Sequence, residues 1–328
     1  MSLKQTLAAA LTGAAAFVCP ALAQDLWLAS PVDCALGRDC FIQQYVDHDD
    51  SRRASDYRCA SLSYDGHTGT DFALPTLRDM RAGVNVLASA AGTVRGVRDG
   101  MPDQLYSNAN AEQVTGRECG NGVAITHPGG WETQYCHLRS GSIAVRSGDR
   151  VAAGKVLGQI GLSGRTQFPH VHLTVRKNGA VVDPFDPDGR ITCGAPSAET
   201  LWISAPAYQA GGLLDVGFAD RIPDYSAVKA GRASASDLPA TAPALVVFGY
   251  AFGGRRGDQM RLTIVGPDGA PFTDHTEDIT RNQAQFFRAT GRERRAQAWP
   301  AGIYRARVQM IRNGVVLSEQ STRVRVRP

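Results

Sequence analysis

Hydrophobic and polar residues alternate over short segments through most of this 328-residue chain. Alternation with a period of two residues places every second side chain on one face, which is typical of a half-buried β-strand. Between residues 61 and 188, strands are predicted within 84–97 (with a turn at Gly92), at 122–127 and 131–138 (joined by a turn at 128–130), at 171–176 and at 181–182. This part of the chain is therefore expected to be β-structure with many turns.

A second series of strands follows a stretch rich in Ala, Ser, Pro and Gly at 194–240, in which 228–243 is the best linker candidate. The predicted strands lie at 245–248, 260–265, 303–311, 315–317 and 324–326. Short strands at this spacing, separated by turn signals, predict a small C-terminal β-sandwich of immunoglobulin-like type. The fold class expected for the whole chain is all-β.

The first residues have the features of a secretory signal. Lys4 supplies a positive start, residues 7–18 form an apolar run, and residues 21–23 (Ala-Leu-Ala) form a cleavage site. We expect cleavage before Gln24 and export to the periplasm or the medium. The apolar run is too short to span a bilayer, and no later segment is long and apolar enough.

The length of the remaining chain, about 300 residues, predicts two domains, because one hydrophobic core rarely covers so many residues. The predicted division is a signal peptide at 1–23, a cysteine-stapled N-terminal region at 24–60, a first β domain at 61–193, a linker region at 194–243 and a β-sandwich accessory domain at 244–328.

The cysteines indicate disulfide bonds. Of the seven cysteines, Cys19 lies in the signal, so six remain after cleavage. An even number of cysteines in an exported chain is typical of a disulfide framework. No Cys-x-x-Cys pair is present, which argues against a zinc site ligated by cysteine. Connectivity is not fixed by the sequence; position favours Cys34 with Cys40, Cys119 with Cys136, and Cys59 with Cys193.

The net charge of +4 is only mildly basic, and no nucleic-acid partner is expected. The segment 241–328 differs, with fourteen arginines, no lysine and seven acidic residues. Arg323, Arg325 and Arg327 alternate, so one face of the last strand should be basic. Two interpretations remain open: an edge strand whose charges block further pairing, or a surface that binds an anionic polymer or a protein partner.

Two histidines one residue apart, His170 and His172, stand about a hundred residues after His67 and Asp71. Alternate residues of a strand point to the same face, so both His170 and His172 should aim into one space. The step from His67 to Asp71 is also even, and its Gly/Thr-rich surroundings favour an extended chain. Two imidazoles and one carboxylate suit Zn²⁺, and three protein ligands leave a fourth position open for water.

The spacing favours His67, Asp71 and His172 as ligands, while His170 need not bind the metal. Zinc held there would lower the pKa of its bound water to about 7, and hydroxide could then attack an amide carbonyl. The attack also needs a proton acceptor, for which His137 and His170 are candidates. The other histidines are interpreted as structural (His127) or as solvated in acidic loops (His48 and His275).

These residues fall into motifs that resemble the lysostaphin-type zinc endopeptidases, metallopeptidase family twenty-three. The resemblance covers roughly residues 61–188, including the run of glycine and valine at 145–158. The motifs are, in order, Gly66-His67-x-x-x-Asp71, Tyr135-x-His137-Leu138, Gly161-x-Ser163-Gly164-x-Thr166, Pro169-His170-x-His172 and Asp183-Pro184.

The resemblance implies an antiparallel two-sheet β core with a groove, Zn²⁺ as cofactor, and cleavage of peptide bonds in bacterial peptidoglycan. It implies His67, Asp71 and His172 as zinc ligands, and His137 and His170 as the catalytic pair. The insertion at 99–119 is longer than a hairpin needs and is expected to line or cover the groove. Because every implied ligand and catalytic histidine precedes residue 183, the C-terminal domain is expected to be separable from the chemistry and to contact the cell wall.

Two alternative functions remain open. Some relatives have lost ligands and only regulate other hydrolases, so a catalytically silent protein that binds and activates another wall hydrolase is one alternative. A general secreted protease of the β-lytic kind is the other. The chain keeps every implied ligand, which favours an active enzyme.

Overall fold

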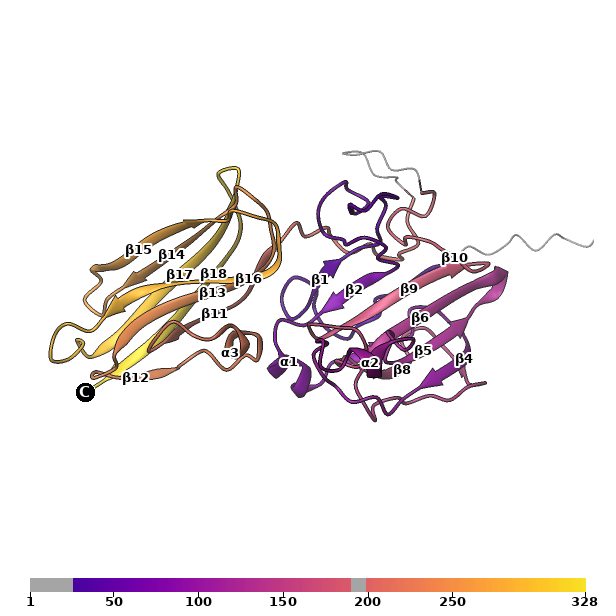
Figure 1. Cartoon of the computed structure of the whole chain (residues 1–328), viewed down its shortest axis with the longest axis horizontal. Helices are drawn as coiled ribbons and strands as arrows, with labels where there is room; N and C mark the ends of the chain where they lie inside the picture. Colours follow the sequence, from indigo (N-terminus) through magenta and orange to yellow (C-terminus); the bar gives the residue numbers. More distant parts are fainter. Residues whose placement is uncertain (1–25, 190–198) are drawn as a thin grey trace, which may run out of the picture.

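The structure is a computed structural model that describes residues 26–189 and 199–328 (Figure 1). The predicted signal at 1–23 lies outside the described residues. Within them, nearly all strand pairs are antiparallel and the helices are short, which confirms the predicted all-β class. None of the described helices has the length and apolar character needed to cross a membrane.

The first lobe is built on one large antiparallel sheet and a small second one. In spatial order the large sheet contains β1 (Phe41–Gln44), β2 (Thr70–Ala73), β9 (His170–Lys177), β6 (Trp131–Leu138), β5 (Asn121–Thr126), β4 (Gly92–Arg98) and β7 (Arg150–Val151), with β10 (Ala180–Val181) paired to β9. The small sheet pairs β3 (Asn85–Leu87) with β8 (Val156–Gln159). The connections contain α1 (Leu77–Ala82), α2 (Ala111–Val114) and η1 (Pro128–Gly130). The predicted hairpin is the pair β5 and β6, joined by η1.

The N-terminal region, predicted as a separate cysteine-stapled segment at 24–60, packs as part of this lobe. Its strand β1 pairs with β2 at the edge of the large sheet. Leu28 and Tyr45 pack in the same hydrophobic core as Phe72. The sequence does not reveal this because β1 has four residues, of which three in succession are buried, so it shows no alternation.

Two of the predicted disulfides are present. Cys34 bonds to Cys40, and Cys119 bonds to Cys136. The second of these ties β6 to the loop that leads into β5. The third predicted pair involves Cys193, which lies outside the described residues, so it stays a prediction.

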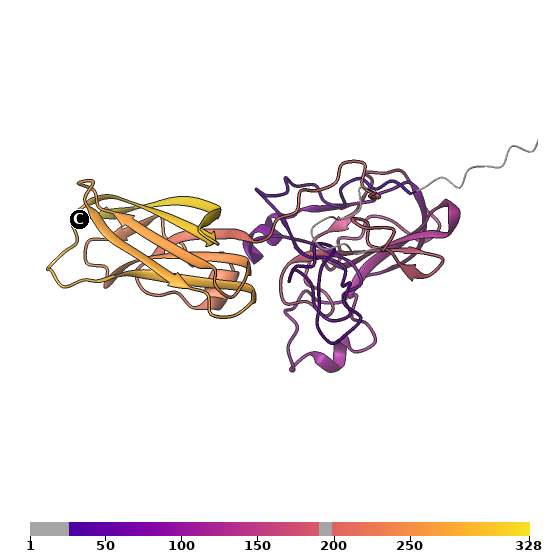
Figure 2. The same cartoon turned by 90° about the horizontal axis from the view of Figure 1, so that it is seen from above.

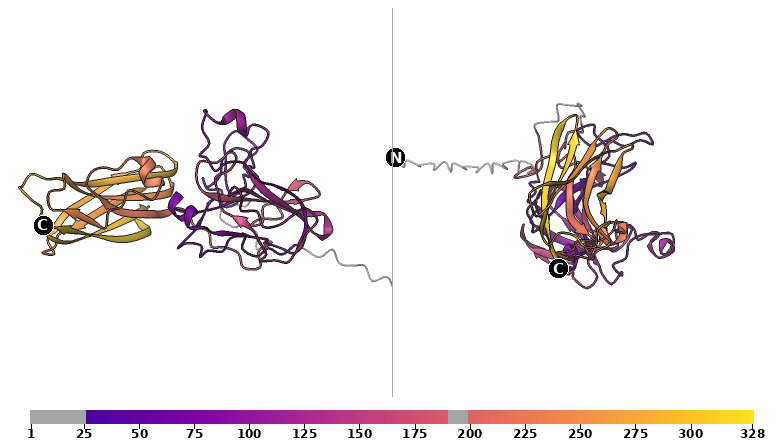
Figure 3. Two further views of the ribbon diagram at one scale, coloured as in Figure 1. Left: turned by 90° about the horizontal axis from the view of Figure 1, so that it is seen from below. Right: turned by 90° about the vertical axis from the view of Figure 1, so that its left-hand side faces the viewer.

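The second lobe consists of two sheets that pack face to face around their own hydrophobic core, which includes Leu245, Leu262 and Val308. One sheet contains β11 (Gly212–Ala219), β13 (Ala244–Gly254) and β16 (Gln283–Glu293); the other contains β12 (Asp237–Pro239), β18 (Val315–Arg327), β17 (Gly302–Arg312), β14 (Gln259–Val265) and β15 (Pro271–Asp278). Figures 2 and 3 show the two lobes lying end to end. The second lobe is the predicted β-sandwich, and its immunoglobulin-like type stays a prediction.

The predicted linker at 194–243 is only partly a connection. Strand β11 pairs with β13 along its whole length, and β12 pairs with the end of β18. The helix α3 (Tyr225–Lys229) lies between these two strands in the chain. The Ala, Ser and Gly content suggested a loop, but pairing with a long central strand stabilises β11, so the sandwich begins near residue 212.

Candidate active site

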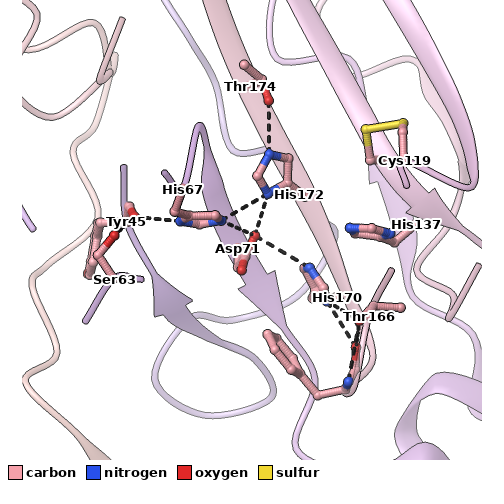
Figure 4. A network of polar contacts seen from close by, with 12 residues as sticks. Tyr45, Ser63, His67, Asp71, Cys119, His137, Thr166, His170, His172 and Thr174 are labelled. Carbon is pink, nitrogen blue, oxygen red and sulfur yellow. Dashed lines mark hydrogen bonds and ion pairs between the residues drawn. A yellow bond between two sulfur atoms is a disulfide. The ribbon is translucent and has the colours of Figure 1, made fainter. Parts of the chain in front are cut away.

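Three of the predicted site residues converge on one point (Figure 4). His67 Nε2 lies 3.1 Å from His172 Nδ1 and 3.2 Å from Asp71 Oδ1. His172 Nδ1 lies 2.8 Å from the same carboxylate oxygen. Asp71 on β2 stands directly opposite His172 on β9 in the sheet register, so the pairing of these strands sets their approach.

These separations fit a four-coordinate zinc ion. Ligand atoms about 2.0–2.1 Å from the metal lie roughly 3.3 Å from one another in a tetrahedron. The other ring nitrogens are engaged: His67 Nδ1–H donates to the carbonyl of Tyr45 at 2.6 Å, and His172 Nε2 forms a hydrogen bond with Thr174 Oγ1 at 3.0 Å. Nε2 of His67 is therefore unprotonated, and His172 can present an unprotonated Nδ1 while its Nε2–H donates to Thr174, as metal binding requires. Among the described residues, this is the one cluster of metal-ligating groups.

Asp71 supplies a negative charge to this cluster. It is only 2% exposed. Burial opposes ionisation, but the surrounding histidines, His67 foremost, hold the pKa of Asp71 well below its usual range. An ionised oxygen beside two neutral imidazole nitrogens suits a divalent cation.

His67 reaches the cluster from a loop, although the sequence predicted an extended segment from His67 to Asp71. It lies before β2, where Gly66 has a φ of 75° and turns the chain. Gly69 then passes close to the ring of His172: a Cβ there would lie 2.6 Å from its Nε2. The predicted residues are therefore brought together, but by a turn with a close backbone approach instead of a continuous strand.

His137 and His170 lie side by side next to the cluster, with ring centroids 4.6 Å apart. His170 Nε2 is 3.5 Å from an oxygen of Asp71. His137 Nδ1–H donates to the carbonyl of Ser163 at 2.8 Å, and His170 Nδ1–H donates to that of Phe168 at 2.9 Å. Burial lowers the pKa of both, that of His137 far below its usual value. Both rings are therefore neutral and keep Nε2 as a proton acceptor.

The backbone of His137 is held in a conformation that few residues other than glycine adopt, with a φ of 65°. Its N–H donates to the carbonyl of Cys119 at 2.8 Å, and the disulfide of Cys136 to Cys119 stands directly before it. Surrounding contacts that fix an unusual backbone are typical of functional positions. This arrangement sets the ring of His137 beside that of His170.

A cavity of about 700 Å³ opens at the site and is lined by Asp71, His137 and His170 among others. The insertion at 99–119 contributes Tyr106, whose N–H donates to the carbonyl of Thr166 at 2.7 Å. This confirms the expectation that the insertion lines the groove.

The sequence did not single out two further residues of the cavity, Tyr225 and Lys229, which come from α3 of the second lobe. No local signal could have found them, because they stand in a short segment more than fifty positions after His172 and reach the cavity only through the packing of the lobes.

The environments of the remaining histidines agree only in part with the interpretation from the sequence. His127 is structural, as expected: Nδ1 lies 2.8 Å from the carbonyl oxygen of Ala91 and Nε2 lies 2.9 Å from Thr133 Oγ1. His275 is exposed, but on β15 and not in a loop. His48 is not solvated; its side chain is 10% exposed and pairs with Asp183 at 2.7 Å.

The first lobe contains the part of the chain that matches a known protein family. The model of peptidase family M23 matches residues 65–184. The DD-carboxypeptidase/endopeptidase Mpg of Neisseria meningitidis serogroup B is 35% identical over 146 residues, which is 44% of this chain and 26% of that protein. The peptidoglycan DD-endopeptidase ShyA of Vibrio cholerae is 29% identical over 133 residues, which is 40% of this chain and 25% of that protein. The chain thus spans about a quarter of the length of these relatives.

Among solved structures, the chain is similar to the catalytic domain of the prophage-encoded M23 protein EnpA from Enterococcus faecalis. The alignment covers 49% of this chain and 96% of that one, with 25% identity and a TM-score of 0.32.

Proposed function

We propose that the chain is an exported zinc metalloendopeptidase that hydrolyses peptide bonds in bacterial peptidoglycan, because residues 65–184 match the model of peptidase family M23. The observation that carries the proposal is the convergence of His67, Asp71 and His172 on one point, with His137 and His170 beside it. The relatives that are named for DD-endopeptidase activity support the substrate class.

When bound, zinc would supply a Lewis acid that polarises the scissile carbonyl and acidifies a water molecule. His67, Asp71 and His172 would hold the ion. Nε2 of His137 or His170 can accept a proton from the attacking water, because Nδ1 of each ring is engaged as a donor. The imidazolium formed can donate a hydrogen bond to the oxyanion and then pass its proton to the leaving nitrogen.

Export and the division into a metallopeptidase domain and an accessory sandwich belong to the same proposal. An anionic wall polymer is the proposed partner of the arginine-rich surface, defined as Arg305, Arg323 and Arg325. Arg305 stands opposite Arg323 in the register of β17 and β18, and all three side chains are exposed. Like charges directly opposite one another destabilise a sheet, and an anionic partner would offset this repulsion.

Metal analysis and digestion of purified wall test the function. We expect one zinc per chain in the wild type and nearly none in His172→Ala. His275→Ala, which removes an exposed histidine on β15, is the matched control and should keep zinc. Zinc-loaded protein should release peptides from purified wall, identified by mass spectrometry, and should leave casein largely intact.

Each other outcome has a defined meaning. Full zinc retention by His172→Ala would reject the ligand assignment. Zinc-loaded wild type that binds wall but releases no peptide would favour the silent, regulatory alternative. Rapid digestion of casein would favour a general protease.

A further inference from the structure

One wall of the active-site cavity is supplied by the C-terminal sandwich. Tyr225 and Lys229 of α3 and Gln285 of β16 line the same cavity as Asp71 and His137. In Figure 1, α3 lies at the junction of the lobes, facing α1. The sequence placed every functional residue in the first lobe, so this contribution is visible only in the folded chain.

Contacts between β1 and the sandwich hold this wall in place. The ring of Phe41 lies against that of Phe252, with centroids 4.4 Å apart. Gln43 Nε2 donates to the carbonyl of Ala284 at 2.9 Å, and Gln285 Nε2 donates to Gln43 Oε1 at 3.1 Å. Because β1 pairs with β2, which carries a predicted metal ligand, the wall is tied to the strand next to the site.

Helix α3 is fixed on the sandwich and presents a cation. Val228 is fully buried with Phe248, and Tyr225 stacks on Phe287 at 5.4 Å. The Lys229 ammonium group lies 5.2 Å from the centre of the Tyr225 ring. An aromatic face orients a cation without neutralising it.

A second cation lines the cavity from the first lobe. The Arg165 guanidinium lies 5.4 Å from the centre of the Tyr106 ring. Neither Arg165 nor Lys229 forms an ion pair with any residue in the described part of the chain. The acidic residues at the cavity are Asp65 and Asp71, and Asp71 is already surrounded by histidines. The cavity therefore offers two positive charges to a ligand.

We propose that Lys229, together with Arg165, forms a carboxylate-binding subsite beside the metal centre, through which the C-terminal sandwich selects peptides that carry a free carboxylate near the scissile bond. This inference rests on the proposed peptidase function and names its substrate class more closely. Hydrogen bonds from an ammonium or guanidinium to a carboxylate are charge-assisted and about twice as strong as neutral ones. A peptide can present the carboxylate at its C-terminus or on an acidic side chain, and the chemistry is the same.

The test uses the full-length zinc-loaded chain and one short peptide in four forms: both carboxylates free, the C-terminus amidated, the side chain amidated, and both amidated. Wild type should show a higher kcat/KM for the free acid than for the double amide. Lys229→Met should lower this ratio about tenfold or more through KM, as expected for loss of one charge-assisted hydrogen bond. The single amides identify which carboxylate is bound.

Lys177→Met is the matched control, because the Lys177 ammonium also lies over an aromatic ring, 4.7 Å from the centre of Trp131, but outside the cavity. It should keep the wild-type ratio. An unchanged ratio in Lys229→Met would overturn the inference and leave the peptidase function intact.

If wild type cleaves none of the four peptides, the proposed function fails, and equilibrium binding of the free acid decides the inference. Weaker binding by Lys229→Met but not by Lys177→Met would support the subsite, and equal binding would reject it.

Discussion

At the scale of single residues, the partner of each histidine determines which ring nitrogen faces the site. His67 presents Nε2 because its Nδ1 donates to the carbonyl of Tyr45, whereas His172 presents Nδ1 because its Nε2 is hydrogen-bonded to Thr174. The carbonyl of Ser163 accepts a hydrogen bond from Nδ1–H of His137, which leaves Nε2 of His137 facing the site. Similar rings thus present different nitrogens to the site because of their hydrogen-bond partners, and two of these partners, Tyr45 and Thr174, lie outside the motifs.

We expect the variants His137→Ala and His170→Ala to bind zinc and to keep their fold, but to lose activity. General acid–base groups contribute on the order of 10²–10⁴-fold, so kcat should fall by about that factor on a soluble wall peptide. Zinc content and circular dichroism are measured in parallel, with His275→Ala as the control. Wild-type turnover in either variant would remove its proposed role, and loss of zinc from His170→Ala would make His170 a metal ligand.

At the scale of elements, two loops meet behind His137. Ser163 accepts a hydrogen bond from the N–H of Asn121 at 2.8 Å and donates one to the carbonyl of Leu138 at 2.7 Å. Gly120 and Gly164 both have positive φ and approach so closely that neither position has room for a Cβ. The loops therefore support His137 through backbone contact.

The substitution Gly164→Ala, compared with Gly179→Ala, should distinguish the effect of this close backbone approach from the effect of a positive φ. Gly164 has a φ of 84°, and an added Cβ would overlap the carbonyl of Glu118. Gly179, with a φ of 87° and open space around it, is the matched control. Both changes should cost about 1 kcal/mol for backbone strain, and Gly164→Ala should cost more and lower kcat. Urea denaturation and peptide turnover measure the difference; equal effects in the two variants would contradict it.

The N-terminal region is linked to the end of the large sheet by His48 and Asp183, whose side chains are 2.7 Å apart and largely buried. Burial alone would lower the pKa of His48, but the hydrogen bond and charge of Asp183 raise it above its usual value. The folded state therefore favours protonated His48. This stabilisation is full below the unfolded pKa of about 6.5 and is lost as the pH rises through the higher folded pKa.

His48→Gln should remove this pH dependence. The free energy of unfolding of the wild type should exceed that of the variant by more at about pH 5.5 than at about pH 8.5, by on the order of 1 kcal/mol. Urea denaturation at several pH values measures it, with His275→Gln as the control for an exposed histidine. A constant difference across this range would show that the pair is not charged.

At the scale of the whole molecule, the sandwich has two different surfaces. The sheet that carries β16, with α3, faces the active-site cavity, whereas β17 and β18 of the other sheet carry the arginine-rich surface. The first lobe therefore holds the candidate metal site, and the second contributes a wall of the cavity and a separate basic face. Removal of the sandwich would expose Phe41, so a shortened chain should be less stable as well as less selective.

The arginine-rich surface should bind wall in a salt-dependent way. Arg323→Gln combined with Arg325→Gln should weaken sedimentation with purified wall and flatten its salt dependence, because exposed charges are screened over about 8–10 Å near physiological ionic strength. Arg261→Gln is the control, since Arg261 already pairs with Asp274 at 2.6 Å. Wall binding that neither the double change nor salt alters would leave these arginines as charges on a solvated sheet face.

The sequence by itself determined the all-β class, the hairpin whose second strand carries His137, and the five residues proposed for the candidate site. Alternation reports which face of a strand is buried, and the spaced motifs resemble a family whose site residues are known. His170 and His172 could be placed on one face because the side-chain period of a strand is fixed.

Only the tertiary structure decided how His67 reaches the site, that β1 and β11 join sheets, and that Lys229 faces the cavity. Each of these depends on contacts between segments far apart in the chain. A short buried strand without alternation, or a helix of five residues, carries no local signal of its neighbours, because packing and not local propensity determines its place.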